Sequence, residues 1–192
     1  MSENATLPTL GDLVWAPALE HPELLAEPVR AALTAWTDAD ARVASLVAVT
    51  EIDPDHAETA TLNELHDLPP EASANCVLVA GKRGEDERVA ACVVPASTFA
   101  DVNKRVRKLL DVRKASFLPM DRAVADSGME YGGITPVGLP AGYRVLVDSR
   151  FAEKGTMALM GSGVRRSKLL MPGPVLCAMP GVEVIEDLGI TR

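Results

Sequence analysis

Aromatic residues and cysteines are scarce in this sequence. Phe, Trp and Tyr together make up 4% of the 192 residues, so the core has to be built from Val, Leu, Ile, Ala and Met. The three cysteines, Cys76, Cys92 and Cys177, are odd in number and form no CxxC pair, and only three histidines accompany them. This pattern argues against a disulfide framework and against a zinc site. We therefore expect a cytoplasmic protein that uses no metal ion and no other cofactor.

Several common sequence signals are missing as well. The opening segment "MSENATLPTLGDL" has no basic stretch followed by an apolar run, so no signal peptide is predicted. No apolar run approaches the length that spans a membrane, and we expect no membrane partner. Neither HExxH nor GxxxxGK[ST] occurs, which argues against a metal or nucleotide enzyme.

Basic residues are also fewer than acidic ones, which gives the chain a net charge of −8. Phosphate contacts are mainly electrostatic, so such a chain is a poor general nucleic-acid binder. A nucleic-acid partner would have to meet a local basic face or be delivered by another protein. Two segments offer such a face: "NKRVRKLLDVRK" (residues 103–114) and "SGVRRSK" (residues 162–168), hereafter the basic turn. Each can also be a solvated surface without a partner.

Apolar periodicity predicts a mixture of helices and strands, which is typical of an α/β (mixed α+β) domain. Residues 10–36 have helical spacing, with a break or kink at Pro28, and form a helical N-terminal extension over residues 1–40. The clearest local signal is a β-hairpin over residues 75–95 with a polar turn at 81–87. Further strands are predicted at 42–52, 143–151, 155–163 and 167–171, and further helices at 53–69, 98–119, 120–128 and 173–180.

The segment "MEYGGITPVGLPAGY", residues 129–143, is hereafter the glycine loop. No helix or strand favours four glycines and two prolines in so short a stretch. Glycine lets a backbone approach a ligand closely because no Cβ stands in the way, and Pro136 would stiffen the loop. A plain tight turn between a helix and a strand is the alternative explanation.

Three passages, taken in order, resemble the YbaK/prolyl-tRNA-editing superfamily of trans-acting aminoacyl-tRNA deacylases. "YGGITPVG" (residues 131–138) is similar to the family's glycine loop with its GxxxP motif at 132–136. "MGSGVRRSKLLMPG" (160–173) looks like its late glycine-basic turn, and the hairpin followed by a basic helix looks like its centre. The resemblance covers about residue 43 to the C-terminus. It implies a mixed, mostly antiparallel sheet flanked by helices, and it assigns residues 41–192 to the deacylase domain.

The resemblance implies metal-free hydrolysis of a small mischarged amino acid, such as Ala or Cys, from the 3′ end of tRNA. The backbone amides of Gly132 and Gly133 would hold the ester and its oxyanion. Met129, Ile134 and Val137 would line a small pocket. Further substrate contacts are expected from Thr135, Pro136, Ser162, Gly163 and Arg166.

The sequence departs from the family at a lysine that many members carry on the first strand of the hairpin. Asn75 stands there, and an amide brings no positive charge. Where some relatives have an acidic residue in the late turn, this chain has Lys168. We therefore expect Asn75 and Lys168 to be catalytic together, with Lys168 supplying the missing cation.

Two other interpretations stay open at this point. The chain can be a non-catalytic member that binds aminoacyl-tRNA or a synthetase, prolyl-tRNA synthetase included, and the loss of the lysine at position 75 favours this. A thiol nucleophile at Cys76 is conceivable, but a cysteine in an apolar strand is more often inert core.

Overall fold

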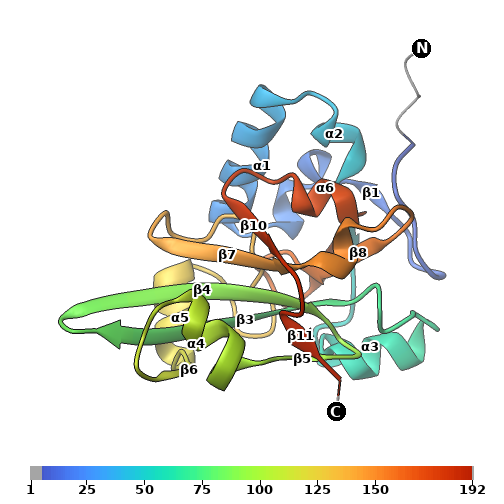
Figure 1. The fold of residues 1–192 in the computed structure, drawn as a ribbon. Helices are drawn as coiled ribbons and strands as arrows, with labels where there is room; N and C mark the ends of the chain where they lie inside the picture. Colours follow the sequence, from blue (N-terminus) through green and yellow to red (C-terminus); the bar gives the residue numbers. More distant parts are fainter. Residues whose placement is uncertain (1–5, 192) are drawn as a thin grey trace.

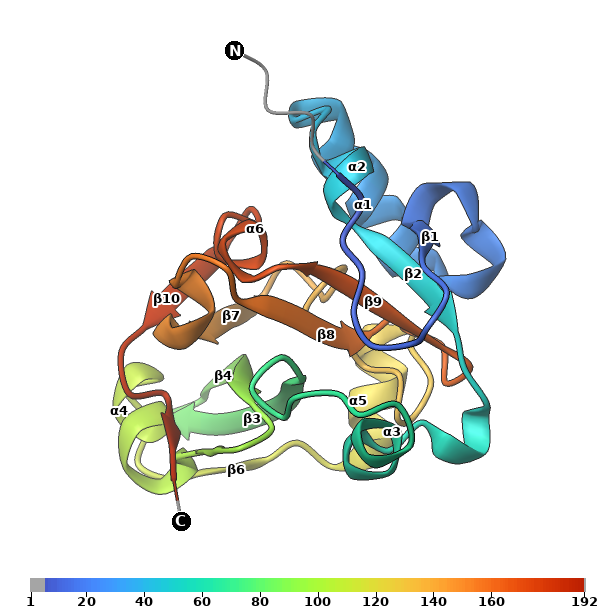
Figure 2. The ribbon, with the colours of Figure 1, turned by 90° about the vertical axis from the view of Figure 1, so that its right-hand side faces the viewer.

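Most strands of the chain assemble into two β-sheets with a shared core between them (Figure 1), and a third sheet has only two strands. The computed structural model describes residues 6–191. Figure 2 shows β8 and β9 of the first sheet lying over β3 and β4 of the second. The first sheet has the strand order β1-β2-β9-β8, formed by β1 (Ala16–Pro17), β2 (Ala48–Glu51), β9 (Ser167–Pro172) and β8 (Met157–Gly161).

The second sheet has the strand order β10-β7-β4-β3-β6. Only β4–β7 and β7–β10 are parallel among the strand pairs of the described residues. The predicted α/β class with a mixed, mostly antiparallel sheet is therefore confirmed. The strands of the second sheet are β3 (Ala74–Arg83), β4 (Asp86–Pro95), β6 (Ala115–Phe117), β7 (Tyr143–Asp148) and β10 (Val182–Ile185). β5 (Phe99–Ala100) and β11 (Gly189–Ile190) pair with each other in the third, two-stranded sheet.

Helices and single helical turns cover the sheets. Helix α5 ends at Gly128, whose φ of 65° only glycine adopts readily, as the sequence predicted. The helices are α1 (Glu27–Ala39), α2 (Val43–Leu46), α3 (Thr59–Leu65), α4 (Arg107–Leu109), α5 (Met120–Ser127) and α6 (Gly173–Cys177). The shorter turns are η1 (Ala18–Glu20), η2 (Pro22–Leu24), η3 (Pro54–His56), η4 (Val102–Val106) and η5 (Ser149–Ala152).

The predicted hairpin is present as β3 and β4, but its turn is shorter than expected. Arg83 pairs with Asp86, so only two residues close the turn, and one of them is Gly84 with a φ of 63°. Strand β4 is central and buried on both faces: Ala90 and Cys92 face η4, and Val93 faces the core between the sheets. This explains why its sequence is a continuous apolar run.

Two predicted elements are wrong in type or extent. The strand expected at 42–52 is confined to β2, because residues 43–46 form helix α2. The helix expected at 98–119 ends at α4, where Asp111 takes a φ of 52°, and residues 115–117 become strand β6 on the edge of β3. In the second case the pairing with β3 overrides the local helical pattern.

The N-terminal segment packs against the core between the two sheets. Val29, Leu33 and Trp36 on α1 are buried in the same cluster as Met160 and Leu169. The helix expected over residues 10–36 is wrong in extent, because residues 16–24 form β1, η1 and η2 and helix α1 begins only at Glu27. Pro28 lies in the first turn of α1, so the break expected at Pro28 falls just before it. The division into residues 1–40 and 41–192 stays a prediction. Between residues 6 and 191, no helix is both long and apolar enough to cross a membrane.

Candidate functional site

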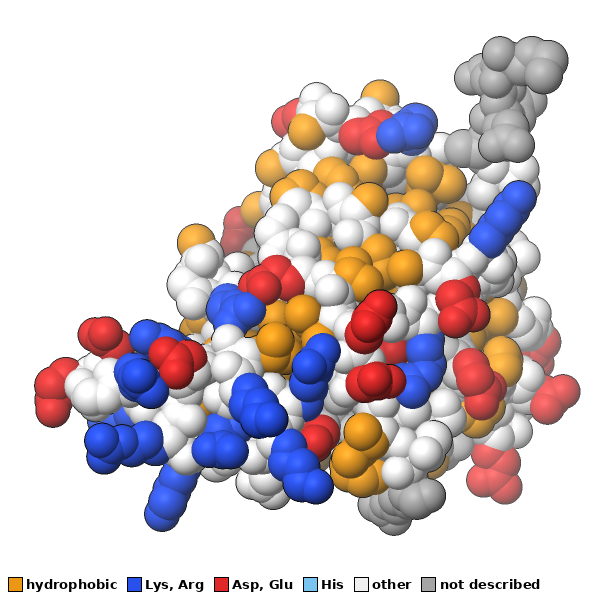
Figure 3. All heavy atoms as spheres, viewed as in Figure 1, with side chains coloured by type: hydrophobic (Ala, Val, Ile, Leu, Met, Phe, Trp, Pro, Cys, Tyr) orange, Lys and Arg blue, Asp and Glu red, His pale blue; other side chains and the backbone are white. Residues whose placement is uncertain are grey.

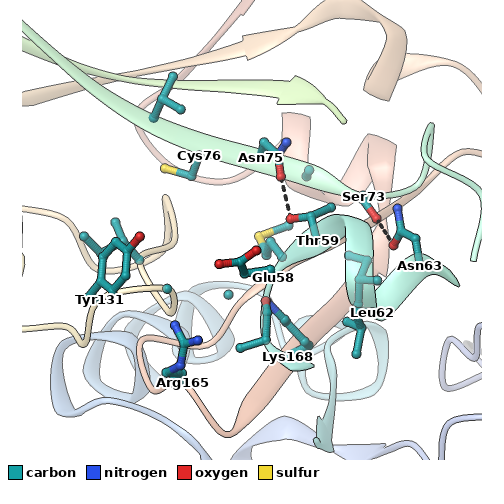
Figure 4. Close-up of a pocket in the computed structure, with 18 residues that line it drawn as sticks. Glu58, Thr59, Leu62, Asn63, Ser73, Asn75, Cys76, Tyr131, Arg165 and Lys168 are labelled. Atoms are coloured by element: carbon teal, nitrogen blue, oxygen red, sulfur yellow. Dashed lines mark hydrogen bonds between the residues drawn. The ribbon is translucent and has the colours of Figure 1, made fainter. Parts of the chain in front are cut away.

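A pocket of about 380 Å³ lies where α3 and the start of β3 face the glycine loop and the ends of β8 and β9 (Figure 4). Its floor and walls are partly apolar, and its polar side chains come from four separate segments. The pocket is lined by Ala57, Glu58, Thr59, Leu62, Asn63, Ser73, Ala74, Asn75, Cys76, Val77, Tyr131, Gly132, Ile134, Leu159, Met160, Gly161, Arg165 and Lys168. Four of the predicted site residues therefore meet here: Gly132, Ile134, Asn75 and Lys168.

The glycine loop and the basic turn are joined backbone to backbone beside the pocket. Glu130 N–H donates to Gly163 O, and Gly163 N–H donates to Gly133 O, each at 2.8 Å. A Cβ on Gly133 would lie 2.7 Å from a backbone atom of Val164, and a Cβ on Gly161 would lie 2.2 Å from Gly133 O. Only glycine fits at such distances, so these two glycines allow the glycine loop to pack closely against the end of β8 and the basic turn.

Some residues of the glycine loop that line the pocket have backbone N–H groups without a protein acceptor in the described part of the chain. Gly133 N–H donates to Glu130 O at 2.9 Å and is occupied. Gly132 and Ile134, which both line the pocket, donate to no acceptor within residues 6–191. Preorganised donors of this kind stabilise a developing oxyanion, because they need no reorganisation during the reaction.

Lys168 gives the pocket a buried positive charge. Its side chain belongs to β9, which lies between β2 and β8, and the residue is 7% exposed. Nζ donates to Ala57 O at 2.8 Å and forms no ion pair with a carboxylate in the described part of the chain. Burial, reinforced by the charge of Arg165, lowers the pKa of Lys168 to about 8. The ammonium form still dominates at pH 7 and keeps two N–H donors for a ligand.

Asn75 is held in one orientation by α3. Its Oδ1 accepts the hydroxyl proton of Thr59 at 2.8 Å (Figure 4), and its amide N–H groups donate to no acceptor within residues 6–191. A second bond of the same type joins the two elements nearby, because Ser73 Oγ donates to Asn63 Oδ1 at 2.8 Å. Strand β3 and helix α3 thus fix both amides of the pocket.

The opening of the pocket carries a carboxylate, a guanidinium and an aromatic ring. Glu58 precedes α3, is exposed, and forms no ion pair among the described residues. Two contacts hold the side chain of Arg165 in place. Its Nε donates to Pro54 O at 2.9 Å, and its guanidinium carbon lies 5.9 Å from the ring centroid of Tyr131. Figure 4 shows Glu58, Tyr131 and Arg165 grouped on the same side of the pocket.

The remaining predicted contacts lie outside the pocket lining. Ser162 is fully buried, and its hydroxyl is within 2.6 Å of Ser167 Oγ. Arg166 forms an ion pair with Glu51 at 3.2 Å. Buried positions beside or beneath the two loops are taken by the other predicted residues, Gly133, Met129, Thr135, Pro136, Val137 and Gly163. Their contribution to the site is support of the loops, and their direct contact with substrate stays a prediction.

Cys76 lines the pocket but is a poor nucleophile. Burial, together with the nearby Cys92, raises the pKa of its thiol far above neutral pH. The reactive thiolate is therefore scarce at neutral pH. Within residues 6–191 no group of three or more His, Cys, Asp or Glu side chains is placed to hold a metal ion.

Most residues that line the pocket were not among the predicted contacts, and they include Glu58, Thr59, Tyr131 and Arg165. Tyr131 and Arg165 lie inside the two motifs, so their positions beside Gly132 and Lys168 offered a signal. Glu58 and Thr59 come from a short helix with no motif of its own. No sequence signal connects that helix to a loop 70 residues further on.

Comparison with known proteins supports this reading of the fold. The chain is similar in fold to hypothetical protein APE2540, with a TM-score of 0.67 and 18% identity over 83% of this chain and 99% of that chain. It is also similar to a scaffold protein from epitope backbone grafting by computational design, with a TM-score of 0.68 and 16% identity over 84% of this chain and 95% of that chain. A third similar structure is described as a "putative trans-editing enzyme for prolyl tRNA synthetase", with a TM-score of 0.66 and 13% identity over 84% of this chain and 97% of that chain. No curated protein is similar enough in sequence to count as a match.

A family comparison covers most of the chain and includes the pocket. Residues 53–176 match the aminoacyl-tRNA editing domain. That range begins just before α3 and ends in α6, so every segment that lines the pocket lies inside it. The chain therefore belongs to the aminoacyl-tRNA editing domain family.

Proposed function

We propose that this protein is a trans-acting editing hydrolase that removes a small mischarged amino acid, such as Ala or Cys, from the 3′ end of tRNA. The observation that carries the proposal is the meeting of Gly132, Ile134, Asn75 and Lys168 around one pocket. Family membership supplies the class of substrate. A cytoplasmic location is part of the proposal.

The proposed reaction is hydrolysis of the ester between the amino acid and the terminal ribose. The oxygen of water bonds to the carbonyl carbon, the bond from that carbon to the ribose oxygen breaks, and a proton from water ends on the ribose oxygen. The neighbouring ribose hydroxyl assists in activating the water. The free N–H groups of Gly132 and Ile134 and the ammonium of Lys168 stabilise the negative charge on the carbonyl oxygen.

Lys168 takes the role of the cation that position 75 lacks. Asn75 and Lys168 line the same pocket from different strands, which supports this exchange of roles. The amide N–H groups of Asn75 then orient the substrate by hydrogen bonding, while Lys168 supplies the charge. If Lys168→Ala leaves deacylation intact, this exchange of roles is wrong.

The size of the pocket favours a small aminoacyl group. Its volume of about 380 Å³ lies near the lower end of the range for ligand pockets. Leu62, Val77, Ile134, Leu159 and Met160 surround it with apolar surface. Since the terminal adenosine also has to be accommodated, larger amino acid side chains are excluded by size.

A deacylation assay on a panel of charged tRNAs tests the proposal. The pure protein is incubated with Ala-, Cys-, Ser- and Pro-tRNA, alone and with prolyl-tRNA synthetase. The expected result is selective release of one small amino acid, abolished in a folded Gly132→Val variant, because a side chain at a φ of 81° strains the loop. Release of none of the four above the rate in buffer contradicts the proposal.

The second candidate function is a non-catalytic module that binds aminoacyl-tRNA or a synthetase. Asn75 in place of lysine favours it, and so does a surface where Lys and Arg side chains gather around α4 and the hairpin end (Figure 3). Its exposed basic residues are Lys82, Arg83, Lys104, Arg105, Lys108, Arg113 and Lys114. Tight binding of Ala-tRNA without any release of alanine would support this candidate over the hydrolase.

A further inference from the structure

We propose that Glu58 receives the α-ammonium group of the aminoacyl ester, so that the pocket selects aminoacyl-tRNA with a free amino group over N-acylated aminoacyl-tRNA. The inference rests on the proposed function, because it takes the ligand of the pocket to be an aminoacyl ester. It adds a specificity-determining residue that neither sequence motif contains.

The hydrogen bonds around the pocket leave few acceptors for a cation. The amide oxygen of Asn75 already accepts from Thr59, and that of Asn63 accepts from Ser73. The main-chain oxygen of Ala57 accepts from Lys168. Each of these oxygens already accepts one hydrogen bond, so a carboxylate with both oxygens free is the stronger acceptor for an ammonium group entering the pocket.

Glu58 is the acidic side chain among the residues that line the pocket. Its carboxylate forms no hydrogen bond or ion pair within residues 6–191. The other charged lining residues are Lys168 and Arg165, which suit the carbonyl oxygen or a phosphate. The pocket therefore offers opposite charges to the two polar ends of an aminoacyl ester, an ammonium and a developing oxyanion.

A structural role for Glu58 is the competing explanation. A negative charge at the N-terminus of a helix interacts favourably with the helix dipole and stabilises the helix, and Glu58 occupies the N-cap position of α3. Its side chain makes no capping hydrogen bond there, however. A dipole effect would change stability slightly and would leave the choice between free and acylated amino groups unchanged.

The test measures binding, so that it does not depend on hydrolysis. The probe is an acceptor-stem RNA whose terminal adenosine carries alanine through a non-hydrolysable amide, prepared with a free amino group and with an N-acetyl group. Wild-type protein is expected to bind the free-amine probe at least tenfold more tightly, since hydrogen bonds to charged groups are the strong ones.

Two variants assign the preference to Glu58. Glu58→Gln keeps the shape and removes the charge, and it is expected to bind the two probes about equally. Glu64→Gln is the matched control, because Glu64 is an exposed residue of the same helix outside this pocket, and it should keep the wild-type preference.

Equal affinities of the wild-type protein for the two probes, no measurable binding of either probe, or a preference that persists in Glu58→Gln would overturn the inference. A preference that depends on Glu58 in a protein that hydrolyses no aminoacyl-tRNA would uphold it while refuting the proposed hydrolysis. The two proposals can therefore fail separately.

Discussion

Replacing the buried lysine by an apolar side chain of similar length should stabilise this protein. In Lys168→Met the charge that burial disfavours is gone. Burial lowers the pKa of Lys168 from 10.5 to about 8, and a difference of about 2.5 between folded and unfolded pKa values corresponds to about 3 kcal/mol. Loss of the hydrogen bond to Ala57 O reduces this stabilisation by about 1 kcal/mol. The net gain of about 2 kcal/mol should raise Tm by about 4–8 °C at pH 7.

The pH dependence of this gain identifies its cause. The pKa of Lys168 is lower in the folded state than in the unfolded state, so the unfolded state binds more protons between pH 8 and 10.5. Wild-type stability therefore rises with pH in that window, and the cost of the buried charge is fully present below about pH 8. At pH 9.5 the wild-type protein should have recovered about 2 kcal/mol, and the difference in Tm between the two proteins should nearly vanish.

Thermal unfolding followed by circular dichroism at pH 7 and pH 9.5 measures both effects. Lys154→Met is the control, since it removes an exposed lysine that does not line the pocket of Lys168; its Tm should stay within about 2 °C of wild type. A Lys168→Met protein that is less stable than wild type at pH 7, or a gain that is the same at both pH values, would refute the reasoning.

Three further changes test other parts of the site. Thr59→Val should lower kcat/KM about fivefold by releasing the amide of Asn75, whereas Thr59→Ser should retain activity; equal losses in both would contradict an orienting role. Gly161→Ala should lower the free energy of unfolding by about 2 kcal/mol, because the new Cβ meets a backbone oxygen of the glycine loop. Gly142→Ala is the control, since its Cβ lies in open space, and it should change the free energy of unfolding little when both variants are measured by chemical denaturation. If the basic surface contacts phosphates, Lys108→Gln should lower the slope of log tRNA affinity against log salt concentration by about one counterion. An unchanged slope would show that Lys108 faces solvent and contacts no phosphate.

The sequence predicted the elements whose signal is local. The hairpin of β3 and β4 follows from two apolar runs around a polar turn, and α5 follows from helical spacing that ends at Gly128. The glycine loop was predictable for the same reason, because its composition suits no regular element. These features do not depend on distant partners.

Elements that depend on a distant partner were missed or misassigned. Strand β6 looks helical until its residues pair with the edge of β3, and β10 acquires its strand conformation alongside β7. The site shows the same division. Gly132 and Lys168 lie in recognisable motifs, whereas Glu58 reaches the pocket only through the packing of α3.

Hydroxyl groups illustrate why residue type alone misleads. Ser162 lies in a glycine-flanked basic turn, which suggested a substrate contact, yet its hydroxyl bonds within the turn. Thr135 is fully buried in the glycine loop. The hydroxyl that orients a pocket residue belongs to Thr59, in a segment without glycine or basic residues.

The most direct test of the central claim is release of the amino acid from Ala-tRNA and from Cys-tRNA at pH 7 by wild-type protein and by Lys168→Met. Wild-type protein should release at least one of the two amino acids well above the rate in buffer, and the variant, although at least as stable, should release it at the buffer rate. Wild-type protein without activity, or a variant that keeps the wild-type rate, would contradict an editing reaction that uses Lys168 in this pocket.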